Sequence, residues 1–533
     1  MTPRKIAALL VILLITISML SVTGCGGKSG PKYLRYSVGA EPETLDPRKS
    51  TGIPEATVEA QLFEGLTTLD AKNAPVPAMA EKWEISADGL KYKFILRPGI
   101  KWSNGDPVTA YDFEYGWKTA LSPELGSKYA YQLFYVKNGE AYNKGLTTAD
   151  NVGVKALDDK TLEVILEKPT AYFLSLTAFH TLYPVPRRIV EANPKWAADP
   201  KTLVGNGPFK IAAWVHNSRI ELVKNDQYWD AGKVKMPKLD FILTESGSTE
   251  LAMFDNNQID MGDNAPPAEY PRLKKEGRLQ ISPYLGTYFF SYNVTKAPLD
   301  NVKVRQALTL ALDRQAIIDN VTKGEQKAAF AWVPPGMADA APTADFRTVG
   351  GDYFQDRNIE AAKKLLAEAG YPEGKGLPPI ELIYNTSDVH KAIAEAVQEM
   401  WRKNLGVNIT INNQEWKVFI NTRSKGDYQI ARHGWIGDYA DPMTFIDMFD
   451  SASGNNDSHY KNPQFDTLVR LAKSTGNQDI RMKAMHEAEK LLMDDAVIAP
   501  VYFYTRVMMV KPNVKAYQRS VLGHVYFKEA YVE

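Results

Sequence analysis

The sequence predicts a mixed α/β protein of two or three domains, on the basis of three observations. The chain has 533 residues, which is more than a single hydrophobic core usually serves. Short segments of alternating apolar and polar residues dominate its first half. From about residue 300, helical patterns run directly into strand patterns, which is typical of an α/β fold.

The composition is that of an ordinary folded protein, with 44% hydrophobic and 24% charged residues. It argues against disorder, collagen and coiled coil. Basic and acidic residues both number 63, and this balance argues against a dedicated nucleic-acid binder. The single cysteine excludes an intramolecular disulfide and a cysteine-rich metal cluster.

The first 25 residues predict export. Arg4 and Lys5 precede a short apolar run over 6–20, which is too short for a membrane span of about 20 residues. The sequence Val-Thr-Gly-Cys over 22–25 resembles the lipobox of bacterial lipoproteins. We therefore predict a signal peptide over 1–24, lipid on Cys25, and a tether over 25–35 that holds the body outside the cytoplasmic membrane. The alternative is a plain signal peptide with a chance cysteine.

The body begins with strand patterns. Residues 91–97 alternate and end at a Pro-Gly turn, and similar segments occupy 160–166, 219–223 and 239–243. A shorter helical pattern covers 110–120.

Helices follow in the second half. Apolar spacing predicts helices over 302–321, 358–369 and 388–405. Gly370 and Gly406 end the last two, and a strand over 407–411 follows at once.

Local motifs for catalysis are missing from the sequence. Neither HExxH nor GxSxG occurs, and no two of the seven histidines stand four residues apart. Asp438, Asp441 and Asp447 form a cluster that suggests the carboxylate pair of a glycosidase. An extracellular hydrolase therefore stays as the alternative from a different class.

Long motifs make the chain similar to the family-5 extracellular solute-binding proteins, the receptors of ABC importers. The longest covers 80–118 and reads AEKWEISADGLKYKFILRPGIKWSNGDPVTAYDFEYGWK. Further matches in the family's order are EPETLDP (41–47), LFEGLTTLD (62–70), NGPFKIAAW (206–214), VRQALTLALDRQAII (304–318), NPQFDTLV (462–469) and PVYFYT (500–505). Within the family the likeness is greatest to its oligopeptide receptors, through YNTSDVHK (384–391), NQEWKVFINTR (413–423) and IARHGWIGDYADP (430–442).

The resemblance implies a two-lobed periplasmic-binding-protein-like fold with an extra inserted domain. Lobe I would be discontinuous, because both chain ends and a middle segment contribute to it. The implied limits are 36–64, 187–286 and 506–533 for lobe I, 65–186 for the inserted domain and 287–505 for lobe II.

The resemblance also implies how a peptide is held. Asp438 matches the acidic residue that takes the peptide α-amino group, and an ammonium in a closed cleft needs such a partner. Residues of two facing strands match those that pair with the peptide backbone, and they are Gly434, Trp435, Ile436, Thr51 and Ile53. Residues two apart on a strand direct their amides the same way, so Gly434 and Ile436 can both meet the ligand.

The other end and the side chains of the peptide have matches too. The positions that receive the peptide carboxylate are Arg423, Arg432 and His390. The residues that line side-chain pockets are Tyr129, Trp416, Asn385, Tyr288, Tyr502 and Tyr504. The segment 333–346 departs from the family pattern, which leaves the preferred peptide length open.

The implied function is a lipid-anchored receptor that binds short peptides and delivers them to an ABC permease with its ATPase subunits. We expect a monomer, with no cofactor, no metal and no nucleic-acid partner. A murein-peptide or dipeptide receptor of the same family is the alternative, and a nickel or haem receptor would need histidines that face the cleft.

Overall fold

The structure is a computed structural model, and it describes residues 33–533. The predicted signal peptide and lipid site at Cys25 lie outside the described residues. Within 33–533, no helix has the length and apolar character that crossing a bilayer requires.

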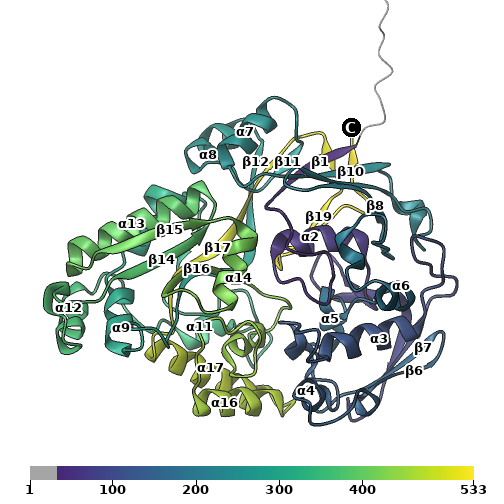
Figure 1. Cartoon of the computed structure of the whole chain (residues 1–533), viewed down its shortest axis with the longest axis horizontal. Helices are drawn as coiled ribbons and strands as arrows, with labels where there is room; N and C mark the ends of the chain where they lie inside the picture. The colour runs from purple at the N-terminus through teal and green to yellow at the C-terminus, as the bar shows by residue number, and fades with distance from the viewer. Residues whose placement is uncertain (1–32) are drawn as a thin grey trace, which may run out of the picture.

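One eleven-stranded sheet runs through both lobes of the molecule (Figure 1). Strands β12 (Leu279–Tyr292) and β17 (Ile498–Val510) form its centre and pair antiparallel along most of their length. We call lobe I the part built on β1 (Leu34–Gly39), β8 (Phe209–Val215), β9 (Arg219–Lys224), β10 (Lys238–Leu243) and β11 (Met261–Gly262). Lobe II is built on β13 (Lys327–Ala328), β14 (Ile380–Asn385), β15 (Ile409–Gln414) and β16 (Ile430–Ile436).

The two central strands connect the lobes. β17 pairs with β11 of lobe I at Met509 and Val510, and β12 pairs with β16 of lobe II from Gly286 onward. The β12–β17 register shifts between Pro283 and Thr287, which interrupts the ladder where the chain passes from one lobe to the other. The predicted boundaries at 286/287 and 505/506 lie close to this irregularity and stay predictions.

Lobe I also holds α2 (Ile53–Leu62), α6 (Arg187–Ala192), α7 (Gly247–Asp255) and α8 (Tyr270–Lys275). Close to the chain end it adds the strand pairs β18 (Val514–Lys515) with β21 (Tyr531–Val532) and β19 (Gln518–Arg519) with β20 (Val525–Tyr526).

A separate four-stranded antiparallel sheet forms the inserted domain. Its order is β4 (Ala80–Ile85), β5 (Lys91–Leu96), β7 (Thr161–Ile165) and β6 (Val154–Asp158). Helix α3 (Ala110–Leu121) packs on it, and a capping box between Thr109 and Asp112 fixes where α3 begins. The domain also contains β2 (Thr67–Leu69), β3 (Pro75–Pro77), the 3₁₀ turn η1 (Ala130–Leu133), α4 (Gly139–Asn143) and α5 (Phe173–Leu176).

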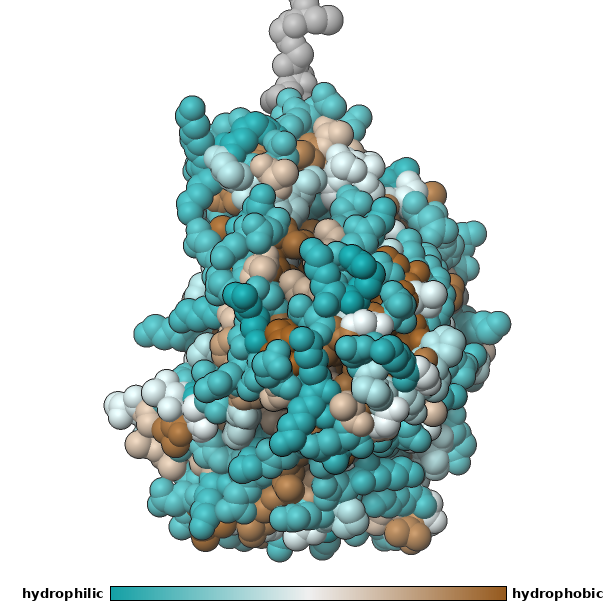
Figure 2. Space-filling view, turned by 90° about the vertical axis from the view of Figure 1, so that its left-hand side faces the viewer, coloured by the Kyte–Doolittle hydropathy of each residue, from teal (hydrophilic) through white to brown (hydrophobic). Residues whose placement is uncertain are grey.

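Lobe II contains most of the helices in the second half of the chain. They are α9 (Val302–Leu310), α10 (Arg314–Ile317), α11 (Phe346–Gly350), α12 (Ile359–Glu368), α13 (Asp388–Leu405), α14 (Trp416–Ser424), α15 (Met443–Ile446), α16 (Pro463–Lys473) and α17 (Gln478–Asp494). Their inward sides bury apolar residues against the sheet, while the outer face of the lobe is mainly hydrophilic (Figure 2).

The predicted helix over 388–405 and the predicted strands at β5, β7, β9 and β10 are confirmed. The prediction of one helix over 302–321 is wrong. The chain leaves helical geometry at Asp313, whose side chain accepts a hydrogen bond from the Ala316 amide and starts α10. A π-helical turn over Ile318–Thr322 completes the segment, so one apolar stripe covers three short elements.

Candidate functional site

Strand β16 has an open edge in lobe II. β12 pairs with β16 along its whole length, whereas β14 reaches only two residues of β16, Ile430 and Ala431. Within the described residues, the other edge from Arg432 to Ile436 has no strand beside it. Such an edge offers unpaired amides to an extended ligand.

The register decides which amides these are. The Gly437 amide donates to the Leu285 carbonyl (2.9 Å), and the Asn293 amide donates to the Gln429 carbonyl (2.9 Å). Because bonded and non-bonded pairs alternate in antiparallel strands, Gly434 and Ile436 turn their amides toward the open edge. Trp435 turns its main chain to Thr287 of β12, which corrects the prediction that it contacts a peptide backbone.

Gly434 is held against lobe II's aromatic residues. A Cβ at this position would overlap the Tyr504 hydroxyl and lie 3.3 Å from an Arg432 nitrogen. The main chain of Gly434 can therefore sit at this edge only because it carries no side chain.

Asp438 lies just beyond the end of β16 and is 8% exposed. The Tyr129 hydroxyl donates to its Oδ1 (3.2 Å), and the Gln132 amide donates to its Oδ2 (2.8 Å). Both donors belong to the inserted domain, so this carboxylate lies where that domain meets lobe II. The predicted role of Tyr129 in a side-chain pocket stays a prediction. Gln132 was not predicted, because no sequence pattern marks it.

Asp438 differs from its acidic neighbours in its ion pairing. No basic side chain within residues 33–533 forms an ion pair with it, whereas Asp441 pairs with Arg481 and Asp447 with Lys473. Burial, and then the nearby Asp447, raise the pKa of Asp438 well above its usual value. An ammonium ion beside it would therefore be strongly favoured.

Arg432 stands on the same edge, two residues before Gly434. Its guanidinium donates to the Tyr504 hydroxyl (2.9 Å) and the Asn385 side-chain oxygen (3.3 Å), and it lies 5.0 Å from the Tyr288 ring. Its Nε has no partner, and no carboxylate within the described chain pairs with it. Tyr502 stacks on Tyr288 behind this group, with centroids 4.8 Å apart.

His390, at the start of α13, completes the cluster around Arg432. Its Nδ1 lies 3.5 Å from the Tyr288 hydroxyl. Burial, and then the charge of Arg432, hold the pKa of His390 well below its usual value. The neutral imidazole still has a hydrogen-bond donor, and the predicted role of His390 in binding the peptide carboxylate stays a prediction.

Arg423 is not a free cation. Its Nε donates to Asp457 Oδ2 (2.6 Å), and both side chains are nearly inaccessible to solvent. No sequence pattern marks Asp457 as a partner, because the pair is 34 residues apart. Its part in binding a peptide carboxylate stays a prediction.

The expected facing strand at 51–53 is not formed. Gly52 is extended but caps α2, and Ile53 is the first residue of that helix because Pro54 suits a first turn. The roles of Thr51 and Ile53 stay predictions. Trp416 of α14 lies close to this segment, with its Nε1 3.4 Å from Glu55 Oε1 of α2, so it connects lobe II to lobe I.

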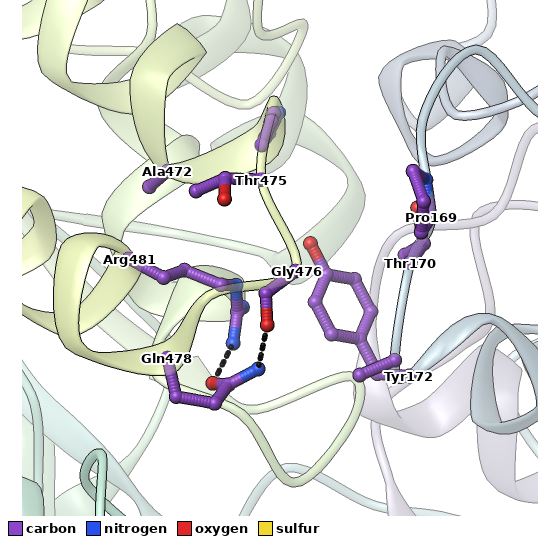
Figure 3. A pocket seen from close by; sticks show the side chains of 10 residues that line it. Pro169, Thr170, Tyr172, Ala472, Thr475, Gly476, Gln478 and Arg481 are labelled. Carbon is purple, nitrogen blue, oxygen red and sulfur yellow. Dashed lines mark hydrogen bonds between the residues drawn. The ribbon is translucent and has the colours of Figure 1, made fainter. Parts of the chain in front are cut away.

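The inserted domain and lobe II also meet away from Asp438. A cavity of about 510 Å³ lies between them, lined by Tyr131, Tyr135, Asp447 and Lys473 among others. Beside it, Tyr172 points from the inserted domain toward Arg481 and Gly476 of lobe II (Figure 3). With the contacts at Asp438 and Trp416, these describe a closed arrangement of the domains.

The chain is similar to known solute-binding proteins. The family model described as "Bacterial extracellular solute-binding proteins, family 5 Middle" matches residues 74–457. The oligopeptide-binding protein OppA of Bacillus subtilis is 42% identical over 99% of both chains. The crystal structure of Haemophilus influenzae OppA with the peptide RPPGFSPFR has a TM-score of 0.89 at 34% identity, covering 95% of this chain and 99% of that one.

A third relative has been solved in two forms. The Escherichia coli murein tripeptide binding protein MppA gives a TM-score of 0.89 at 34% identity, covering 95% of this chain and 99% of that one. The unliganded open form of MppA gives only 0.62 at 33% identity, with 95% and 98% covered. The difference agrees with the closed arrangement.

Proposed function

We propose, since the chain belongs to the bacterial extracellular solute-binding proteins of family 5, that it is a receptor that encloses short peptides between its lobes and delivers them to an ABC permease. The relatives named as oligopeptide-binding and murein tripeptide binding proteins support a peptide ligand. Family membership also supports a binding protein of a transport system rather than an enzyme.

One observation carries the proposal: a buried carboxylate that no basic side chain of residues 33–533 pairs with stands at the end of an open strand edge. Asp438 supplies a place for the α-ammonium group that every unmodified peptide has. Gly434 and Ile436 supply amides and carbonyls for the peptide backbone. These contacts do not depend on the peptide's side chains, so a receptor built on them accepts many sequences.

Arg432 is the best placed partner for the other end of a peptide. It projects from the same strand as Gly434, and its Nε has no protein partner. A peptide extended along β16 advances about 3.3 Å per residue. It would pass Ile436 and Gly434 and then bring its carboxylate to Arg432, with the donors of His390 and Asn385 close by.

Binding is coupled to closure because the site is shared between domains. Asp438 belongs to lobe II, while the groups that surround it belong to the inserted domain. A peptide contacts all of them only in the closed form and therefore favours that form. The closed receptor would then dock on the permease, whose ATPase subunits supply the energy.

The hydrolase alternative loses its main support. Asp441 and Asp447 are each paired with a cation, Arg481 and Lys473, so the structure accounts for both carboxylates without a catalytic role. Recovery of intact peptide from the purified protein would agree with a receptor, whereas turnover of peptide or glycan would contradict it.

We also propose that the receptor is monomeric and is anchored outside the cytoplasmic membrane by lipid on Cys25. Replacing this residue, Cys25→Ser, should release the protein from membranes on fractionation. Retention of the variant in the membrane fraction would contradict the anchor but leave peptide binding untouched.

Calorimetry with matched peptides tests the function directly. Tri-, tetra- and pentapeptides with a free α-amine should bind, and their N-acetylated forms should bind at least tenfold more weakly, because acetylation removes the ammonium charge. Peptides with a diaminopimelate residue separate a murein-peptide receptor from a general one. Equal binding of free and acetylated peptides would overturn the role of Asp438.

A further inference from the structure

The cavity of about 510 Å³ between the inserted domain and lobe II lies outside the proposed peptide contacts. Helix α4 borders it from the inserted domain and α16 from lobe II, and the two helices lie side by side in Figure 1. Its lining does not include Gly434, Ile436, Arg432 or Asp438. Its volume lies within the range of about 300–1,000 Å³ that is usual for sites of small organic ligands. The cavity is therefore large enough for a second ligand besides the peptide.

Aromatic rings form much of the wall on the inserted-domain side. Tyr131 and Tyr135 are buried, Phe134 is half-buried, and all three line the cavity. The Tyr131 hydroxyl accepts a hydrogen bond from the Asn455 amide (3.4 Å). The Tyr135 hydroxyl donates to Asp447 Oδ2 (3.2 Å). With both hydroxyl groups engaged by the protein, the ring faces are left as a surface that suits an apolar or aromatic group of a ligand.

Three carboxylates and one ammonium group form the less accessible part of the lobe II wall. Asp447 is inaccessible to solvent, and Asp450, Asp466 and Lys473 are half-buried. Lys473 Nζ pairs with Asp447 Oδ2 (3.0 Å), so one positive charge is set against three carboxylates. The other charged residues that line the cavity are exposed, namely Glu140, Lys144, Glu167, Lys168 and Arg470. Because water and salt screen exposed charges, the sheltered part of the cavity keeps an excess of negative charge.

The carboxylates of this wall also lack hydrogen-bond donors. Asp447 Oδ1 is buried and accepts no hydrogen bond from the described residues. Asp450 and Asp466 each accept a main-chain amide of residues 451–452 through Oδ1 (2.8 and 3.0 Å), and no basic side chain within 33–533 forms an ion pair with either. Burial raises the pKa of Asp450, Lys473 lowers it, and the nearby Asp466 raises it again. A ligand that brings both positive charge and donors would relieve this cost.

We propose that this cavity binds a small organic amine with an aromatic or apolar body, and that the bound amine stabilises the closed form. Its ammonium group would lie among Asp447, Asp450 and Asp466, and its body would pack on Tyr131 and Tyr135. The inserted domain supplies the rings and lobe II supplies the carboxylates, so only the closed form offers both to the amine. Binding of the amine goes beyond the proposed function, whereas its effect on peptide affinity rests on that function.

Calorimetry of the peptide-free protein tests the site with three probes that share a phenyl ring. Phenethylamine is positively charged, phenethyl alcohol is neutral and phenylacetate is negatively charged. The amine should bind at least about tenfold more tightly than the other two, because only the amine forms charge-assisted hydrogen bonds with the carboxylates. Equal binding of the three probes, or no binding of the amine, would overturn the proposal.

Asp450→Asn keeps the shape of the wall and removes one charge, so it should weaken binding of phenethylamine by about five- to tenfold. Glu487→Gln is the matched control, because Glu487 is exposed on α17 and does not line the cavity. The control should leave the affinity for the amine unchanged, and thermal melts should show that both variants fold. The proposal would be wrong if Asp450→Asn bound the amine as tightly as the wild type does.

Titrations with trialanine separate this cavity from the peptide site. Saturating phenethylamine should raise the affinity for trialanine about fivefold, and saturating trialanine should raise the affinity for the amine by the same factor. Competition would show that the cavity takes part of the peptide itself, and unchanged affinities would show that the amine does not favour closure. Either result would overturn the proposal. Failure of trialanine to bind would instead overturn the proposed function, and small-angle scattering with the amine alone would then test closure.

Discussion

Tyr172 of the inserted domain stacks on Tyr439 of lobe II, with ring centroids 4.6 Å apart and 9° between the ring planes. Tyr439 directly follows Asp438 in the chain. The Arg481 guanidinium lies 5.0 Å from the centre of the Tyr172 ring and forms an ion pair with Asp441. The loop that carries Asp438, the proposed partner of the peptide's α-amino group, therefore also carries an aromatic contact between the inserted domain and lobe II.

Tyr172→Ala should weaken peptide binding although Tyr172 is not among the groups that surround Asp438. The stack contributes about 0.5–1.5 kcal/mol in addition to the contribution of its buried area, and its loss destabilises only the closed form. We expect affinities about 2- to 12-fold lower, mainly through faster dissociation. Small-angle scattering should show a more open protein at subsaturating peptide. Tyr172→Phe keeps the ring and is the control, and an equal loss in that variant would contradict the role of stacking.

The empty protein should close more readily in acid. When the domains separate, Asp438 loses Tyr129 and Gln132 and meets water, so its pKa returns toward the usual value. In the closed form its pKa is raised, so the closed form binds the proton more tightly. Lowering the pH from 8 to 5 therefore favours closure without ligand, and raising it opposes closure.

Glu55 acts in the same direction, because its pKa is about 7 in the closed form. Glu43 and Glu59 are the other acidic groups near it, and burial raises the pKa of Glu59 well above its usual value. Scattering of ligand-free protein across this pH range measures the effect. Asp438→Asn should reduce the pH dependence, and Glu55→Gln should remove the part near pH 7. A profile unchanged in both variants would refute this explanation.

Asp438→Asn should impair binding of free-amine peptides by roughly 10- to 100-fold, because a charge-assisted hydrogen bond contributes about 1.5–3 kcal/mol. Acetylated peptides are expected to bind weakly to the wild type, and this substitution should lower their affinity little further. Asp441→Asn is a useful comparison, since that carboxylate is paired with Arg481 and lies outside the proposed contacts. If Asp441→Asn reduced the preference for free-amine over acetylated peptides more than Asp438→Asn does, the proposed role of Asp438 would be wrong.

Much of the fold followed from local patterns, as at α13, where Ser387 and Gly406 cap a strongly amphipathic helix. The prediction of one helix over 302–321 was wrong because the apolar stripe continues through the break between α9 and α10, which Asp313 stabilises as a helix cap. Asp438 and Arg432 were found through the family resemblance. Asp457 and Gln132 were missed, because their partners lie 34 and 306 residues away and pairing at such distances leaves no local signal.

Gly434→Ala tests whether the open edge of β16 must stay bare. The new methyl group would meet the Tyr504 hydroxyl, which accepts a hydrogen bond from Arg432. Crowding of this kind costs about 1–3 kcal/mol of stability. We therefore expect a lower melting temperature, together with weaker peptide binding because Tyr504 or the strand edge must shift to make room. Tyr504→Phe removes the clashing oxygen, and the double variant should regain part of the affinity. A double-mutant cycle by calorimetry measures this coupling. If the two losses simply added, the contact between Gly434 and Tyr504 would not limit access to the strand edge.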